Sequence, residues 1–340
     1  MIKFMEAWDA GWVWSNRSGR EQPREVCTMR QHLVILVIAL IVPLAALAAL
    51  GEAPAPTDAA PAPRYVRIGH YQCTCRQGDF EANLSTVIKG LELASEARLD
   101  IVSFPESFLT GYFAKEEEAR AHAFAVDSPE MNQVLQKTAS FEPLFMVGFN
   151  ELRGDDLYDT VAVIEQGKLL GRYSKAMPIY RYFVPGREFP VFEKKGLTFG
   201  VIICADGGYI EPARILALKG ARLIFAPHFN FVSDPVKHYQ MVRNDHIARA
   251  VENGVYFLRA NNVVPGTKLE GMEYDGHGYG DSYLLNPNGE VVAAAGLYHE
   301  YLMIYNFDLQ MEHRSQHAWR SIKSATELLE TLQQALDARQ

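Results

Sequence analysis

Short apolar runs and segments of helical periodicity alternate along the chain from residue 65 onward. Apolar and β-branched runs bounded by turn residues predict buried strands, here at residues 65–71, 100–104, 144–149, 160–164, 168–173, 197–203, 223–226, 255–260, 279–285, 291–295 and 302–307. Apolar residues at helical spacing predict helices at 82–96, 211–219 and 236–253, with Gly254 as a stop signal for the last. This alternation predicts an α/β fold.

The two ends of the chain follow other patterns. An apolar stretch at 33–50 follows Arg30 and precedes residues rich in Pro and Ala, which is typical of a secretory signal. An uncleaved membrane anchor is the alternative, because the stretch approaches the length that spans a bilayer. Apolar residues at helical spacing over 321–336 predict a terminal helix packed on a neighbour.

These patterns divide the chain into five parts. We predict a non-native leader or upstream start at 1–28, a signal peptide or anchor at 29–55 and a Pro/Ala linker at 56–63. One large domain follows at 64–310, with a helical tail at 311–340. We therefore expect an exported protein, periplasmic or extracellular, that touches a membrane only if the apolar segment stays uncleaved.

Composition narrows the function classes. The 340 residues are 48% hydrophobic, enough for a large core, and carry a formal net charge of −8. This acidic balance argues against nucleic acid as a partner. Cys73 and Cys75 form a C-x-C pair without a second pair at metal-ligand spacing, so we expect ordinary thiols and no metal. A strained disulfide in an oxidising compartment is the alternative.

Three reactive residues follow predicted strands. Glu106 comes after 100–104, Lys175 after 168–173 and Cys204 after 197–203. Ligands of α/β sheets bind outside the carboxyl ends of strands, so the three side chains are candidates for one site. A helix N-terminus stabilises the thiolate form of a cysteine that faces it. Such a thiolate can attack a carbonyl carbon. The alternatives are an inert buried cysteine and two solvated loop charges.

At these residues the chain resembles the nitrilase superfamily, the carbon–nitrogen hydrolases that use a Glu-Lys-Cys triad. The resemblance covers roughly residues 64–308. It rests on Phe104-Pro105-Glu106, Tyr173-Ser174-Lys175, Cys204 with Glu211 and Arg214, the segment 248–253 and the segment 280–289. It implies a four-layer α-β-β-α sandwich and a homodimer, because C-terminal segments of this family commonly contact a partner subunit.

The resemblance also implies a reaction. Glu106 would act as general base for Cys204, and Lys175 with the backbone N–H of Ala205 would stabilise the oxyanion. An exported enzyme would then cleave a small amide through a thioester and release ammonia or an amine, without metal or cofactor. The segment 204–209 is similar to aliphatic amidases more than to true nitrilases. Hydrolysis of an N-carbamoyl amide is the runner-up.

One departure from the family pattern bears on this function. Many members carry a second glutamate in the loop after the lysine, but residues 176–186 contain no carboxylate, and Glu188 lies just beyond them. The alternative that the chain is a nitrilase-fold protein that binds a ligand or partner without turnover therefore stays open. Tyr112 and His228 follow predicted strands and are expected to bind substrate. His238 and His246 are expected on the surface.

Overall fold

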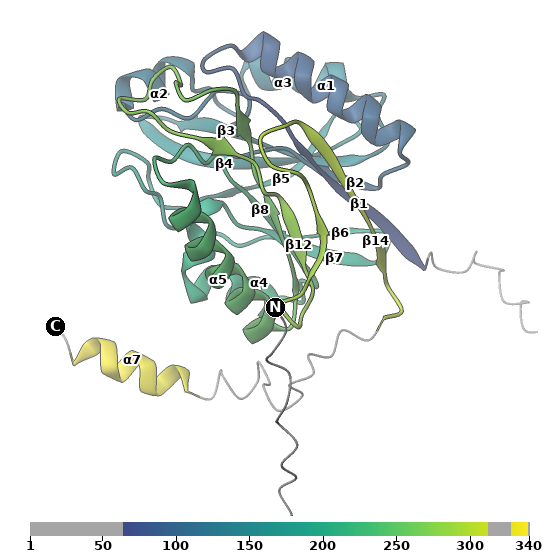
Figure 1. Cartoon of the computed structure of the whole chain (residues 1–340), viewed down its shortest axis with the longest axis vertical. Coiled ribbons are helices and arrows are strands. Elements are labelled where there is room, and N and C mark those ends of the chain that lie inside the picture. The colour runs from purple at the N-terminus through teal and green to yellow at the C-terminus, as the bar shows by residue number, and fades with distance from the viewer. Residues whose placement is uncertain (1–63, 312–327, 339–340) are drawn as a thin grey trace, which may run out of the picture. The chain divides into compact units, whose positions relative to one another are not determined.

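Two six-stranded sheets lie face to face at the centre of the described chain (Figure 1). The structure is a computed structural model that describes residues 64–311 and 328–338. The first sheet has the order β14-β1-β2-β3-β4-β5. Its strands are β1 (Tyr65–Gln72), β2 (Ile101–Ser103), β3 (Leu144–Arg153), β4 (Asp156–Glu165), β5 (Lys168–Ser174) and β14 (Tyr301–Asp308).

The second sheet repeats this arrangement with the order β13-β12-β9-β8-β7-β6. Its strands are β6 (Val191–Lys194), β7 (Leu197–Val201), β8 (Leu223–Pro227), β9 (Tyr256–Ala260), β12 (Tyr283–Leu285) and β13 (Val291–Ala294). In each sheet three central strands are parallel and the flanking strands are antiparallel. A short pair, β10 (Val263–Val264) with β11 (Gly278–Tyr279), lies outside both sheets.

Helices connect the parallel strands, as parallel pairing requires a crossover. They are α1 (Phe80–Glu96), α2 (Glu116–His122), α3 (Pro129–Thr138), α4 (Ile210–Leu218) and α5 (Pro235–Asn253). Figure 1 shows α1 and α3 over the first sheet, and α4 with α5 over the second. The four layers are therefore α-β-β-α, which confirms the predicted fold class.

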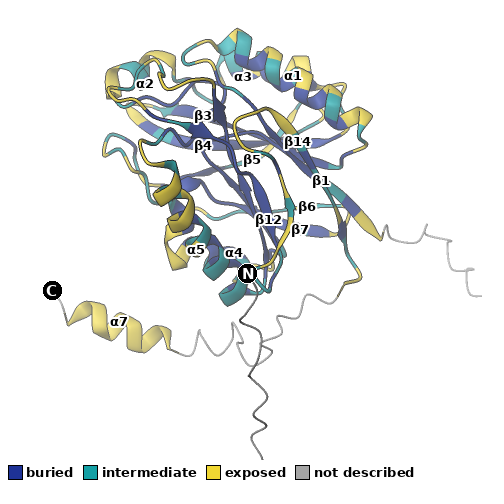
Figure 2. Cartoon of the chain, viewed as in Figure 1, coloured by how far each residue is buried: buried dark blue, intermediate teal, exposed yellow. Residues whose placement is uncertain are grey.

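The buried strands explain why the sequence reads as continuous apolar runs. In β4, Val161 and Val163 face the core between the sheets, whereas Ala162 and Ile164 face the helices on the outside. Both faces of such a strand are covered, so no polar alternation is left. Figure 2 shows the resulting dark, buried strands between half-exposed helices.

Local signals set the helix ends. The Asp79 carboxylate caps α1 by accepting from the Ala82 N–H at 3.0 Å, and Asp234 caps α5 by accepting from the Lys237 N–H at 3.0 Å. Gly254 ends α5 with a φ of 63°, as the sequence predicts. One predicted strand is wrong in part, because Gly280 and Asp281 have positive φ and divide residues 279–285 between β11 and β12.

The terminal predictions stay predictions. Residues 1–63 lie outside the described residues, and so does the first part of the terminal helix predicted at 321–336. Within the described residues α7 occupies Leu329–Asp337, and its leucines are exposed. No helix in the described ranges has both the length and the apolar character needed to cross a bilayer. The homodimer likewise stays a prediction.

Candidate active site

Cys204 lies in the turn that joins β7 to α4. It begins a 3-10 helix, η1 (Cys204–Gly208), and has a φ of 46°, in the left-handed region that non-glycine residues rarely adopt. Backbone strain of this kind persists only where the surrounding contacts hold it, and it clusters at functional sites. Residue Cys204 is 9% exposed. The turn thus fixes a thiol at a nearly enclosed position.

Asp206 holds this turn in place. Its Oδ2 accepts from the Ile203 N–H at 2.9 Å and from the Tyr173 hydroxyl at 2.7 Å, and its Oδ1 accepts from the Met177 N–H at 2.8 Å. Tyr173 and Met177 flank Lys175 in the sequence. One buried carboxylate therefore ties the cysteine turn of the second sheet to the lysine segment of the first.

Glu106 reaches the site from the turn after β2 and is fully buried. Its Oε2 accepts from the Phe229 N–H at 2.6 Å, and its Oε1 accepts from the Lys175 ammonium. Gly148 on β3 makes room for this turn, since a Cβ there would lie 2.3 Å from the Ser107 nitrogen. The backbone and Lys175 together fix both carboxylate oxygens.

Lys175 follows β5 and lies between two carboxylates. Its Nζ donates to Glu106 and, at 3.1 Å, to Oδ2 of Asp159 on β4. An ammonium has three N–H donors, and among the described residues the third has no hydrogen-bond acceptor. The described residues therefore leave one N–H of the Lys175 ammonium unused.

Burial and charge set the protonation of this cluster. Burial raises the pKa of Glu106, and Lys175 opposes that rise. Burial by itself lowers the pKa of Lys175, but Glu106, Tyr112 and Asp159 outweigh it, and the pKa stands above its usual value. Lys175 is therefore an ammonium ion at neutral pH.

The surroundings of Cys204 favour the neutral thiol. Burial raises its pKa, the Glu106 carboxylate raises it further, and Lys175 opposes both. The sequence predicts that a helix N-terminus favours the thiolate, whereas burial and the Glu106 charge act on the pKa in the opposite direction. Cys204 consequently needs a base to become a nucleophile.

A cavity of about 480 Å³ opens beside Cys204. Of the residues predicted to bind substrate, Ala205, Tyr112 and His228 all line it together with Cys204. Much of the remaining wall is aromatic, from Tyr180, Phe229, Phe231 and Tyr274. Glu106 and Lys175 lie buried behind this wall, and the Lys175 nitrogen is 5.7 Å from the centre of the Tyr112 ring. The cavity is large enough for a small organic substrate.

His228 is a neutral wall residue. Its Nδ1 lies 2.6 Å from the Ala226 carbonyl oxygen, which only accepts, so Nδ1 carries the proton. Burial and the nearby His246 and Arg259 lower its pKa.

The predicted surface position of His246 is wrong: this residue is 1% exposed, and its Nδ1 lies 2.7 Å from the Tyr283 hydroxyl. His238 is partly buried and lines the cavity. The face of α5 that carries both histidines packs inward.

Glu188 does not replace the missing loop glutamate at this cavity. It is exposed and borders a separate groove with Arg153 and Arg172. The second carboxylate on Lys175 is Asp159, which sequence reasoning missed. A single acidic residue at the start of the apolar run 160–164 was the available signal, because a charge rarely enters a buried strand without a partner.

Cys73 and Cys75 are separate buried thiols, so the disulfide alternative is wrong for the described structure. Burial raises the pKa of both. Neither lines the cavity. Cys204 is therefore the only cysteine of the described residues that the cavity reaches.

Comparisons with known proteins identify the family and the fold of this chain. The family model for "Carbon-nitrogen hydrolase" matches residues 67–314. The N-carbamoylputrescine amidase of Solanum tuberosum is 30% identical over 276 residues, covering 75% of this chain and 90% of that protein. The glutamine-dependent NAD(+) synthetase of Thermotoga maritima is 29% identical over 242 residues and 68% of this chain, which spans only 40% of that protein.

A solved structure shows the same fold. It is a mutant of the Nesterenkonia AN1 amidase from the nitrilase superfamily, with a TM-score of 0.60 and 22% sequence identity. The match covers 72% of this chain and 93% of that one. At this identity the likeness supports the fold, while the family follows from the sequence match.

Proposed function

Because this chain belongs to the carbon–nitrogen hydrolase family of the nitrilase superfamily, we propose that it cleaves a small amide through a thioester on Cys204. Membership makes it a hydrolase of carbon–nitrogen bonds. The observation that carries the finer proposal is the buried Glu106–Lys175 pair, whose two groups both interact with the Cys204 thiol at the edge of the cavity. That arrangement provides a base, a cation and a nucleophile at one place.

The proposed reaction follows from these positions. Glu106 takes the Cys204 proton, and the sulfur attacks the amide carbonyl carbon. The free N–H of Lys175 and the backbone N–H of Ala205 stabilise the oxyanion. Glu106 then returns the proton to the leaving nitrogen. Water, activated by Glu106, hydrolyses the thioester and regenerates the thiol.

A second candidate is the hydrolysis of an N-carbamoyl amide. Similarity to the N-carbamoylputrescine amidase favours it. The same three groups would serve, since both reactions begin with attack on a carbonyl carbon bound to nitrogen. The two candidate reactions differ in the group that is released and in the group that remains bound to the Cys204 sulfur.

Product analysis separates the candidates. The full-length protein is incubated with acetamide, butyramide and N-carbamoyl-alkylamines, and ammonia, carboxylic acid and free amine are quantified by NMR. An amidase releases ammonia and a carboxylic acid from the first two compounds. The second candidate predicts free amine from the third. If no compound reacts and mass spectrometry finds no acyl adduct on Cys204, binding without turnover becomes the better description.

We also propose that the enzyme is exported. The support is the basic, apolar and small-residue pattern around residues 30–55. Expression of the full chain in a bacterial host, followed by N-terminal sequencing of the periplasmic product, is expected to yield a chain that begins close to residue 55. Protein with an intact N-terminus in the membrane fraction would indicate the anchor instead, and intact protein in the cytoplasm would contradict export.

A further inference from the structure

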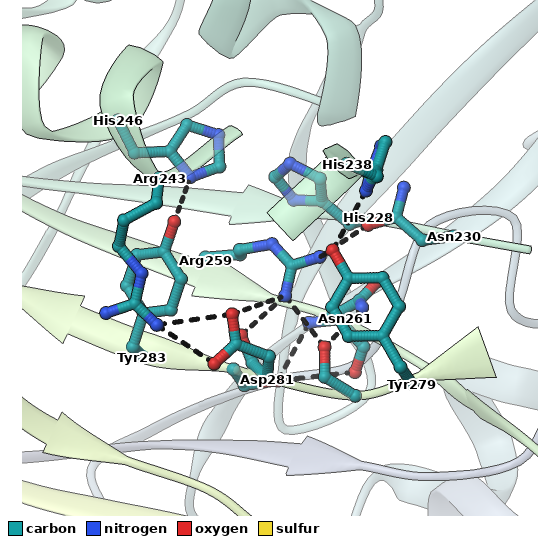
Figure 3. A network of polar contacts seen from close by, with 12 residues as sticks. His228, Asn230, His238, Arg243, His246, Arg259, Asn261, Tyr279, Asp281 and Tyr283 are labelled. Carbon is teal, nitrogen blue, oxygen red and sulfur yellow. Dashed lines mark hydrogen bonds and ion pairs between the residues drawn. The ribbon is translucent and has the colours of Figure 1, made fainter. Parts of the chain in front are cut away.

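A buried guanidinium lies close to the cysteine turn and takes no part in the proposed reaction. Arg259 on β9 is fully buried, and Figure 3 shows it within a network of polar contacts. Its Nη1 donates to the carbonyl oxygens of Gly280 at 2.7 Å and Asp281 at 2.5 Å. Its Nη2 donates to the Tyr279 hydroxyl at 3.1 Å and to Oδ1 of Asn230 at 2.5 Å. Its head group is thus held from several sides.

The charge of Arg259 is balanced by a nearby carboxylate. The Asp281 carboxylate lies 3.8 Å from Nη1, and Arg243 contacts the same carboxylate at 3.0 Å. A buried charge is costly unless it is paired and hydrogen-bonded. The contact of Arg259 with Asn230 is the branch of this network that extends toward Cys204.

Arg259 determines which way the Asn230 amide faces. A guanidinium has only donors, so the atom of Asn230 that contacts it must be the oxygen. The amide nitrogen is then on the opposite side, where Nδ2 lies 4.0 Å from the Cys204 sulfur. The Asn230 backbone is also fixed, because its N–H donates to Oδ1 of Asn262 at 2.6 Å. Asn230 is 5% exposed and lines the cavity.

We propose that Asn230 is a catalytic residue whose side-chain N–H stabilises the Cys204 thiolate, and that Arg259 is the positioning residue that holds the amide in this orientation. The inference rests on Cys204 being the nucleophile of the proposed function. When the thiol proton moves to Glu106, the electron pair left on sulfur receives the Asn230 N–H. Without that donor, the thiolate would form next to Glu106 with less stabilisation.

Alkylation of Cys204 tests the proposal without any substrate. The rate of its modification by iodoacetamide is followed by site-resolved mass spectrometry between pH 7 and 10, because the rate tracks the thiolate fraction. Asn230→Asp keeps the acceptor for Arg259 but loses the N–H donor, and Asn230→Ala removes both. Each is expected to slow alkylation at pH 8 about tenfold or more and to move the profile to higher pH. Arg259→Met is likewise expected to slow alkylation and to move the profile to higher pH.

Arg243→Gln is the matched control. It removes a charge from the same network without contacting Asn230, and alkylation is expected to stay within about twofold of the wild-type rate. Circular dichroism checks that each variant is folded, and the two Asn230 variants are independent tests if one does not fold. Wild-type alkylation profiles in folded Asn230 variants would overturn the proposal, as would equal slowing in Arg243→Gln. Absence of amide turnover would refute the proposed function but leave the alkylation result intact.

Discussion

The Cys204→Ser variant is expected to lose more than about a thousandfold in kcat, with the protein still folded. A hydroxyl occupies nearly the same space as the thiol, so the strained turn and the Asp206 contacts stay in place. Serine is a far weaker nucleophile than cysteine at neutral pH, and no thioester can form. Turnover is measured as ammonia release, and folding as the thermal transition.

Cys73→Ser is the matched control for this loss. Cys73 is buried at the end of β1 and does not line the cavity. Its replacement is expected to lower stability, because a hydroxyl replaces a buried thiol, and to leave turnover per folded molecule unchanged. Substantial activity in folded Cys204→Ser would exclude Cys204 as the nucleophile. Loss of activity in both variants would mean that the loss in Cys204→Ser is not specific to Cys204.

The Glu106→Gln variant is expected to lose about a hundredfold to ten-thousandfold in kcat, the usual contribution of a general base. Glutamine keeps the shape of the side chain and an oxygen that can accept from Lys175 or from the Phe229 N–H. It cannot accept the Cys204 proton. Steady-state kinetics should therefore show a loss in kcat at a nearly unchanged KM.

Asp159→Asn tests whether Glu106 acts as a base or only through its negative charge next to Lys175. Asp159 contacts the same ammonium from β4, at 3.1 Å. If Glu106 acts as the base, Asp159→Asn should lose much less activity than Glu106→Gln, because it weakens only the positioning of Lys175. Equal losses would mean that both carboxylates act solely through the charge of Lys175.

Stability provides a second measurement on Glu106→Gln. The folded-state pKa of Glu106 is raised, chiefly by burial. A raised carboxyl pKa contributes stability at pH values below the unfolded pKa, and that contribution is lost as pH rises through the folded pKa. Glutamine does not titrate, so the variant should gain stability relative to wild type as pH rises from 5 to 9. Urea denaturation at both pH values checks the sign.

The repeated sheet order was not visible in the sequence. Each sheet has three parallel central strands with antiparallel neighbours, yet the strand sequences show no common motif. Burial on both faces requires apolar residues but not particular ones. Sequences of equal hydrophobicity can thus adopt the same arrangement without resembling each other.

The sequence by itself determined the α/β class, most of the strands and the three reactive residues. Apolar runs, helical periodicity and turn residues are local signals that a chain carries along its length. Glu106, Lys175 and Cys204 were identifiable because each follows such a run, and the family resemblance named their roles. The end of α5 at Gly254 was likewise local, since its positive φ suits glycine.

Only the tertiary structure decided which other groups meet these three. Asp159 on β4 contacts Lys175, which follows the neighbouring strand β5. Arg259 contacts Asn230, which lies 29 positions earlier in the sequence. The buried position of His246 follows from packing of α5 on the second sheet. Such contacts depend on strand register and on which helix face packs inward. Residue type does not encode them locally, because a polar side chain is stable either in water or against a buried partner.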